Sequence, residues 1–144
     1  LFERYCTEQE SRLRIVLVAE QASDVAGYGT LLLESPYAPF AEAGIPEISD
    51  LTVLPAFRRQ GIGSLFLDQL EAIAGRRCAR VGLGVGLYAD YGAAQRIYTK
   101  RGYLPDGRGV VSRGRPVPPG ATVRIDDDLC LMLVRELPDE LSRG

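Results

Sequence analysis

The stretch Leu51–Ile73, LTVLPAFRRQGIGSLFLDQLEAI, reads as a strand, a tight turn and a helix in direct succession. Leu51–Leu54 is a short apolar run that ends at a proline, which is typical of a buried strand. Apolar residues recur at helical spacing through the second half, so we expect a helix with one apolar face. Between the two, Gly61 and Gly63 carry no Cβ, and a ligand can approach their backbone closely. The stretch therefore predicts a glycine-bearing turn that leads straight into a helix N-terminus.

Such a turn is a candidate anion site. The first backbone N–H groups of a helix have no partner within the helix, and the helix dipole adds about half a positive charge there. Arg58 and Arg59 bring further positive charge. The spacing does not match the P-loop pattern, and Phe66 stands where the dinucleotide-binding pattern has its third glycine. A phosphate-bearing ligand is one interpretation, and a strand–helix turn that binds nothing is the other.

Composition narrows the class of protein. The chain of 144 residues is long enough for one domain, 1–144, with a proper core, and 46% hydrophobic and 25% charged residues are ordinary for a soluble protein. The net charge of −2 argues against nucleic-acid binding. No apolar run is long enough to span a membrane, and no signal peptide is visible. These features predict a soluble cytoplasmic protein without a membrane or nucleic-acid partner.

The cysteine and histidine counts limit the chemistry. The three cysteines, Cys6, Cys78 and Cys130, are widely spaced, and the chain has no histidine. We therefore expect no metal site and no histidine-based triad. Three isolated cysteines fit a reducing compartment, and small buried side chains are the simplest interpretation of each.

The rest of the chain predicts an α+β protein. We expect a polar helical segment over Leu1–Glu10, and loops over Ser35–Gly44 and Ser112–Asp128. Gly82, Gly84 and Gly86 leave one face of a strand without side chains, which suits close approach of another backbone or a ligand. Strands are expected at Arg12–Glu20 and Val25–Glu34 (a hairpin), Pro46–Leu54, Ala79–Leu87, from Tyr103 and at Leu129–Glu136, with helices at Gly63–Gly75 and Tyr91–Arg101.

Two motifs carry a family resemblance. Arg58–Gly63, RRQGIG, resembles the [RQ]-x-x-G-x-[GA] loop of the GNAT family, the GCN5-related N-acetyltransferases. Ala94–Tyr103, AQRIYTKRGY, resembles the second cofactor motif of the same family, A-x-x-[LI]-Y-x-[KR]-x-G-[FY], and it follows the glycine turn at the family's spacing. Two motifs in the right order are far more specific than either alone. The resemblance covers roughly Val25 to Leu133.

The resemblance implies a fold. GNAT proteins have a strongly twisted mixed sheet, flanked by helices and splayed open between its fourth and fifth strands. The pantetheine arm of acetyl-CoA lies in that gap as if it were a further strand. Family members usually begin with a strand, and this sequence looks as though its N-terminal strand is missing, with Leu1–Glu10 as the following helix.

The resemblance also implies how acetyl-CoA is held. The backbone N–H groups from Arg59 to Ser64 would take the pyrophosphate, Val53 would pair with pantetheine as a sheet edge does, and the N–H near Leu51 would polarise the thioester carbonyl. The residues expected to contact acetyl-CoA are Leu51, Thr52, Val53, Arg58, Arg59, Gln60, Gly61, Ile62, Gly63, Ser64, Ala94 and Tyr98.

Two residues are candidates for proton transfer. Glu47 lies fourteen positions before Gly61, the offset that carries the catalytic glutamate in the histone-type branch of the family. Unless a bulge intervenes, alternation places Glu47 on one face of its strand with Ser49, Leu51 and Val53. Asp50 lies on the other face of a regular strand and is the second choice as base. Tyr98 matches the tyrosine that protonates the departing thiolate, since a phenol is a plausible donor to a thiolate. A solvated carboxylate and a core aromatic ring remain the alternatives for these two side chains.

The acceptor side is less defined. Many relatives carry Asn at the position of Tyr91, and Asp90 or Gln95 are candidates to replace its contact with pantetheine. Asp126, Asp127 and Asp128 would suit a cationic amine, or they form a solvated turn. Arg108, Arg113, Arg115 and Arg124 would instead favour an acceptor with a carboxylate or phosphate. A small-molecule or peptide amine therefore stays open, as does a homodimer.

Three functions compete. The first is an enzyme that transfers the acetyl group of acetyl-CoA to an amine by direct attack in a ternary complex. The second is an acetyl-CoA-binding sensor or regulatory domain without turnover. The third is another nucleotide-binding module that uses the same anion turn, which leaves the match over Ala94–Tyr103 unexplained.

Overall fold

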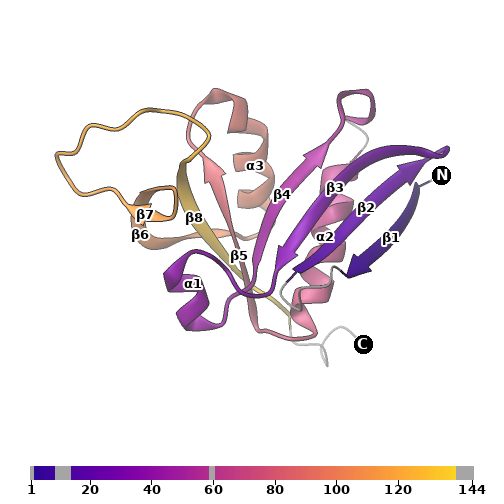
Figure 1. The fold of residues 1–144 in the computed structure, drawn as a ribbon, viewed down its shortest axis with the longest axis horizontal. Coiled ribbons are helices and arrows are strands. Elements are labelled where there is room, and N and C mark those ends of the chain that lie inside the picture. Colours follow the sequence, from indigo (N-terminus) through magenta and orange to yellow (C-terminus); the bar gives the residue numbers. More distant parts are fainter. Residues whose placement is uncertain (1, 9–13, 59–60, 139–144) are drawn as a thin grey trace.

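The protein folds around one eight-stranded mixed sheet with helices on both faces (Figure 1). The structure is a computed structural model that describes residues 2–8, 14–58 and 61–138, and the side chains of 14–58 and 61–138. The order across the sheet is β1-β2-β3-β4-β5-β8-β6-β7. The strands are β1 Phe2–Glu8, β2 Arg14–Gln21, β3 Asp24–Leu32, β4 Glu47–Val53, β5 Arg80–Gly86, β6 Leu104–Ser112, β7 Arg115–Pro116 and β8 Leu129–Glu136. The helices are α1 Ala38–Ala43, α2 Ile62–Gly75 and α3 Gly92–Lys100, with short 3₁₀ turns η1 Pro55–Phe57 and η2 Ala89–Tyr91.

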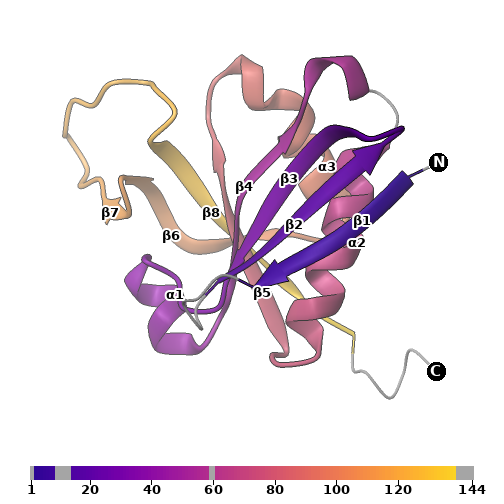
Figure 2. The ribbon, with the colours of Figure 1, turned by 45° about the vertical axis from the view of Figure 1, so that its right-hand side comes forward.

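The first strand corrects one prediction. Phe2–Glu8 is not helical: it pairs antiparallel with β2 along its whole length and forms one edge of the sheet (Figure 2). Aromatic and β-branched residues favour strand here, and the ladder with β2 satisfies backbone groups that a short polar helix would leave to water. An N-terminal strand is thus present at this edge, where the sequence predicted none.

The sheet is splayed between β4 and β5, as predicted. These strands run parallel but are paired only at Glu47 with Gly82 and at Ile48 with Leu83. Beyond Ile48 they diverge, and Figure 1 shows the gap widening toward the end of β4. The β5-facing edge of residues 49–53 therefore lies outside the β4–β5 ladder.

A bulge in β4 changes which side chains share a face. Thr30 of β3 pairs with Ser49, but Tyr28 pairs with Thr52, so two residues of β4 lie opposite Gly29 alone. Asp50, inside the bulge, has a positive φ of 52°. An extra residue reverses the alternation beyond it.

Leu51 and Val53 consequently pack toward α2, in the same core as Ile48. Regular alternation would have put Leu51 and Val53 on the face of Glu47, and the bulge, which that expectation named as its exception, places them on the opposite face.

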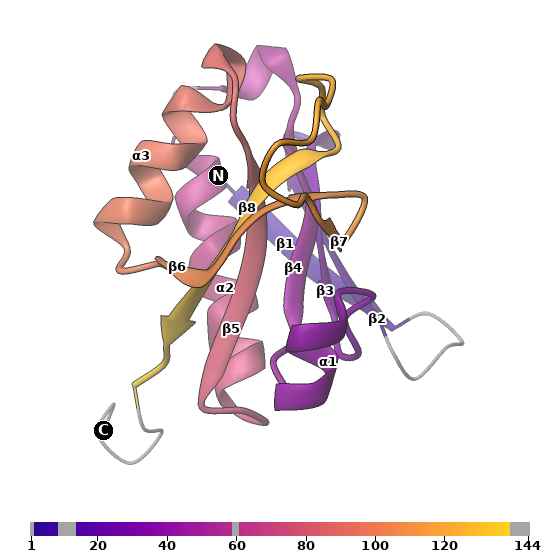
Figure 3. The same ribbon diagram turned by 90° about the vertical axis from the view of Figure 1, so that its left-hand side faces the viewer.

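Helices α2 and α3 lie on one side of β5, and α1 lies on the other (Figure 3). The main core is between the sheet and α2, centred on Phe66, Leu70 and Val81. A smaller cluster under α1 contains Tyr37, Phe40 and Met132 with their neighbours.

The loop predicted at Ser35–Gly44 contains α1. Its start has a proline in the first turn, its end has Gly44 with a φ of 68°, and Phe40 anchors it in the small cluster. A proline at the start and a glycine just past the end are both helix signals, so the local sequence favours a helix here in place of the predicted loop.

The glycines of β5 make room for side chains. A Cβ on Gly82 would lie 2.3 Å from the ring of Phe40, and one on Gly86 would lie 2.3 Å from the ring of Tyr91. A Cβ on Gly84 would meet Met132. The close approach expected at these glycines is therefore made by packed rings and a thioether.

Candidate functional site

The glycine turn ends in an uncapped helix. Gly61 precedes α2 with a φ of 75°, a left-handed conformation that favours glycine, and none of the described side chains caps the helix. No acidic residue occupies the first turn. A Cβ added to Gly63 would meet nothing nearer than 4.0 Å. The N–H groups of Ile62, Gly63 and Ser64 thus begin a helix at an open, positively polarised end, which suits an anion.

Two predicted contacts cannot be placed. Arg59 and Gln60 lie outside the described residues. Their roles stay predictions, and the described part of the turn begins again at Gly61.

The carbonyl of Val53 points into the gap between β4 and β5. The next N–H, that of Leu54, donates to Ala26 O of β3 at 2.9 Å. Because the C=O and N–H of one trans peptide point in opposite directions, the Val53 carbonyl faces away from β3. It accepts a hydrogen bond from Arg58 Nε at 3.0 Å. The group predicted to pair with pantetheine is therefore directed at the gap and is bonded to the exposed side chain of Arg58.

Glu47 lies at the base of the gap. It is half-buried at the start of β4, and Ser35 Oγ donates to its Oε1 at 2.7 Å. Ser35 in turn accepts the backbone N–H of Tyr37 at 3.0 Å, so the serine hydroxyl is fixed.

The surroundings of Glu47 raise its pKa above the ordinary 4.5. Burial is the main cause, the Ser35 hydrogen bond opposes it, and the charge of exposed Asp50 adds to it. A carboxyl with a raised pKa is a stronger base than a solvated one, which is the property a proton acceptor requires.

Tyr98 lies on α3, the helix that follows β5. Its ring is half-buried against the main core, as is Ala94 one turn earlier. Burial raises the pKa of the Tyr98 phenol, so the hydroxyl keeps its proton at neutral pH. Figure 1 shows α3, the helix that contains Tyr98, beside the gap, and Glu47 lies at the start of β4, where the gap begins.

Tyr91 has a role that the sequence did not reveal. Its hydroxyl donates to Asp127 Oδ1 at 2.9 Å, and Tyr88 donates to the same oxygen. The two rings pack edge to face, with centroids 5.1 Å apart. Both hydrogen bonds lower the pKa of Asp127, and the bond from Tyr88 has the larger effect. We call this group, Tyr88, Tyr91 and Asp127, the tyrosine latch; it ties the loop before β8 to the end of β5.

Gln95, one of the two candidates to replace the asparagine contact with pantetheine, is hydrogen-bonded within the protein. Gln95 Nε2 donates to Gly86 O at 2.8 Å, so its amide is engaged within the protein. Sequence reasoning had no signal for the latch, because Asp127 lies 36 positions from Tyr91.

The three consecutive aspartates form a turn. Asp126 accepts the backbone N–H of Asp128 at 3.0 Å, and Asp128 pairs with Arg113 at 3.3 Å. With Asp127 in the latch, all three carboxylates have partners within the protein. The turn interpretation is thus the one that these contacts favour.

An open pocket of about 450 Å³ lies elsewhere, between α1, β6 and the end of β8. Phe40, Arg80 and Arg108 are among its lining residues, and it includes none of the residues predicted to bind acetyl-CoA.

Two further findings concern the described residues only. They contain no group of three or more His, Cys, Asp or Glu side chains placed to hold a metal ion, and Cys78 and Cys130 are free thiols. None of their helices combines the length and the apolar character needed to cross a membrane.

Solved structures of acetyltransferases share this fold. A GNAT family acetyltransferase from Elizabethkingia anophelis, solved with acetyl-CoA bound, matches with a TM-score of 0.68 at 14% identity over 94% of this chain and 98% of that one. An IAA acetyltransferase from Bacillus cereus gives 0.63 at 20% identity, over 88% and 79% of the two chains. A ribosomal-protein-alanine N-acetyltransferase from Brucella melitensis gives 0.61 at 22%, over 86% and 69%.

Sequence comparison identifies the family. No curated protein matches this sequence. The family model for the acetyltransferase (GNAT) domain matches residues 12–105, which is more than half of the chain and includes both motifs. The splayed sheet and the open helix N-terminus beside it are the architecture that this family implies. The chain therefore belongs to the GNAT acetyltransferase family.

Proposed function

We propose that this protein transfers the acetyl group of acetyl-CoA to an amine by direct attack in a ternary complex. The observation that carries the proposal is the gap between β4 and β5, with the uncapped N-terminus of α2 at its mouth. An anion site and a free strand edge, side by side, suit a ligand that combines a pyrophosphate with an amide-containing arm.

The proposed binding roles are those that the family resemblance implies, and the gap and the start of α2 support them. The N–H groups of Gly61, Ile62, Gly63 and Ser64 take the pyrophosphate, with Arg58, Arg59 and Gln60 around it. The strand edge at Leu51, Thr52 and Val53 pairs with pantetheine, for which Arg58 must release the Val53 carbonyl. Ala94, a small side chain on α3, leaves space beside the arm.

The chemical roles follow from the two titrating side chains. Glu47 accepts a proton from the amine, directly or through water, and the neutral nitrogen attacks the thioester carbon. The Leu51 N–H stabilises the oxyanion that forms. As the C–S bond breaks, the nitrogen gives its second proton to water and the amide is released. Tyr98 gives its proton to the thiolate of CoA and regains one from water.

The acceptor is a small-molecule or peptide amine. Asp126, Asp127 and Asp128 already have partners within the protein. Glu47 and Asp50 of β4 are acidic groups close enough to influence each other, and their charge suits a cationic amine. Nucleic acid and membrane are not part of this proposal, and a homodimer remains compatible with it.

Calorimetric titration tests the binding step. We expect acetyl-CoA to bind much more tightly than ADP, because only acetyl-CoA has the arm that pairs with β4. Equal affinities would favour a nucleotide-binding module. No binding of acetyl-CoA by folded protein would contradict the proposal altogether.

A screen of amines for thiol release tests the transfer step. Glu47→Gln and Tyr98→Phe should each reduce turnover by about 10²-fold or more, the usual contribution of a general base or acid. Tight binding of acetyl-CoA without thiol release from any amine would indicate a sensor.

A further inference from the structure

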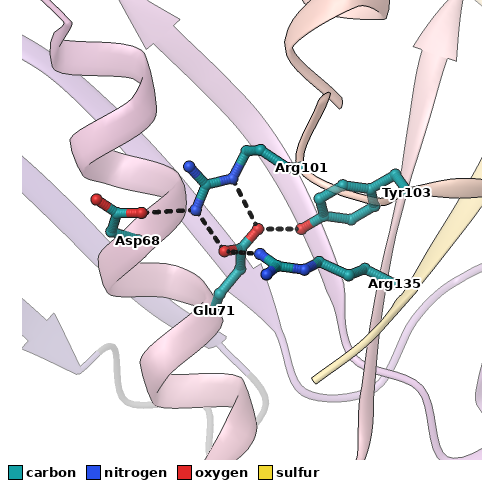
Figure 4. A network of polar contacts seen from close by, with 5 residues as sticks. All are labelled: Asp68, Glu71, Arg101, Tyr103 and Arg135. Carbon is teal, nitrogen blue, oxygen red and sulfur yellow. Dashed lines mark hydrogen bonds and ion pairs between the residues drawn. The ribbon is translucent and has the colours of Figure 1, made fainter. Parts of the chain in front are cut away.

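Glu71 is a buried carboxylate that the proposed mechanism does not use. It lies in the middle of α2, and its side chain is 7% exposed. Three side chains donate to it: Arg101 Nε at 3.1 Å, Tyr103 Oη at 2.8 Å and Arg135 Nη1 at 2.5 Å (Figure 4). Arg101 also forms an ion pair, at 2.7 Å, with Asp68, which lies one turn before Glu71 on α2. Two carboxylates and two guanidinium groups balance in charge, and we call these five residues the Glu71 network.

The network reaches Tyr98 by two routes. Arg101 and Tyr103 both donate their backbone N–H to the Tyr98 carbonyl, at 3.2 and 3.0 Å. The rings of Tyr103 and Tyr98 are also in contact, with centroids 5.7 Å apart and a tilt of 59°. The backbone and the ring of Tyr98 are thus both held by residues whose side chains Glu71 anchors.

We propose that Glu71 is a positioning residue, which fixes the Tyr98 phenol relative to α2 through Arg101 and Tyr103. This rests on the proposed role of Tyr98 as proton donor. A donor must lie within hydrogen-bond reach of the departing sulfur, and small errors in placement are expensive in rate. Helix α2 then serves both ends of the cosubstrate: its first turn receives the pyrophosphate, and Glu71 sets the position of the proton donor.

The chemistry of the contacts suits this task better than apolar packing would. A buried ion pair adds little net stability compared with hydrophobic residues, but its hydrogen bonds fix direction. Burial and the charge of Glu71 raise the pKa of Tyr103, so its hydroxyl keeps its proton and continues to donate to Glu71. The arrangement therefore persists over the whole neutral range.

The first test is Tyr103→Phe, which keeps the ring and deletes the bond to Glu71. We expect kcat to fall by about 10-fold to 100-fold, as misplacement of a catalytic group does, while the Kd for acetyl-CoA stays within about twofold. Glu71→Gln should act in the same direction. Thr99→Val is the control. It removes an exposed hydroxyl hydrogen bond from α3, the helix that contains Tyr98, and Thr99 is not part of the network.

A double-mutant cycle separates positioning from general damage. If Tyr103 acts through Tyr98, then Tyr103→Phe should reduce kcat hardly at all in a Tyr98→Phe background. Losses that add fully would contradict the proposal, and so would a loss of acetyl-CoA affinity equal to the loss of kcat.

A readout without turnover keeps the two proposals distinguishable. In protein labelled with 3-fluorotyrosine, the ¹⁹F resonance of Tyr98 is assigned from its absence in Tyr98→Phe. Tyr103→Phe and Glu71→Gln should shift or broaden it, and Thr99→Val should not. An unchanged resonance would overturn the positioning role, even if the enzyme is active. A shifted resonance in a protein that turns over no amine would support the positioning role and count against the proposed function.

Discussion

Burial of Glu47 at the base of the gap makes its protonation the first pH-dependent step to examine. The deprotonated form accepts the proton, so kcat/KM should rise with pH through a pKa above 4.5. Glu47→Gln should remove this limb and lower kcat/KM by about 10²-fold. Because the charge of Asp50 raises the pKa of Glu47, Asp50→Asn should move the limb to lower pH. If the rise of kcat/KM with pH disappears in Asp50→Asn and persists in Glu47→Gln, Asp50 is the base.

The same raised pKa predicts a pH-dependent stability. The native state binds this proton more tightly than the unfolded state, so the wild type loses stability as pH rises from 4.5 through the native pKa. Glu47→Gln has no such loss, and its amide oxygen can still accept from Ser35. The Tm of the variant relative to wild type should therefore be higher at pH 7 than at pH 4. An opposite trend in thermal denaturation would contradict the raised pKa.

Gly82 shows how tightly β5 is covered. An added Cβ would lie 2.3 Å from the ring of Phe40, which is 1% exposed, so the ring or the strand would have to shift. Gly82→Ala should lower the free energy of unfolding by about 1–3 kcal/mol, the usual cost of overpacking. Gly92→Ala is the matched control, because its Cβ would meet nothing within 4 Å. Urea denaturation of both variants measures the difference, and equal midpoints would contradict it.

The loop before β8 depends on the tyrosine latch. We expect trypsin to cut after Arg124 much faster in the Tyr88→Phe/Tyr91→Phe double variant than in wild type, because Asp127 then loses both hydrogen-bond donors. Asp127→Asn should have a similar effect. The hydrogen bonds from Tyr88 and Tyr91 hold the pKa of Asp127 below its ordinary value, so in wild type the latch should stay closed at neutral pH and open only in acid.

The control for the latch is Asp128→Asn. It breaks an exposed ion pair with Arg113, in which both side chains are more than half exposed, and such pairs contribute little. Equal cleavage rates in the latch variants and the control would show that the latch does not hold the loop.

The secondary structure was largely predictable where local signals suffice. Leu129–Glu136 is β8 with the predicted bounds, and α2 begins one residue before the predicted Gly63. The failures came where tertiary contacts decide. Phe2–Glu8 is a strand because β2 offers it a partner, and that partner is not visible in the local sequence. Ala38–Ala43 differs, because a proline in its first turn and Gly44 after its end are local helix signals, and burial of Phe40 adds to them.

The Glu71 network joins α2, β8 and the segment between α3 and β6, so we expect its loss to destabilise the whole fold. Glu71→Ala leaves Arg101 and Arg135, which are 17% and 26% exposed, without their main partner. Removing one member of a buried ion pair typically costs about 3–5 kcal/mol. We expect a loss near the lower bound, because both arginines keep some solvent contact. Chemical denaturation checks this, and a loss no larger than that of Asp128→Asn would contradict it.

Elements whose formation depends on residues close together in the chain could be predicted from the sequence alone. The glycine turn at Gly61–Gly63, the apolar face of α2 and the motif at Ala94–Tyr103 are local patterns, and together they were enough to indicate the GNAT fold. They also placed Glu47 and Tyr98 on the elements where the structure has them, although their catalytic roles remain proposals.

The contacts between these elements could be seen only in the three-dimensional structure. The bulge at Asp50 turned Leu51 and Val53 away from Glu47's face, and one added residue is invisible to a pattern that assumes strict alternation. The tyrosine latch and the Glu71 network join residues 30 or more positions apart. Contacts between residues so far apart form only when the whole chain packs. A buried polar group without a partner is then costly, so packing selects arrangements that supply one. No pattern in the local sequence predicts such a pair.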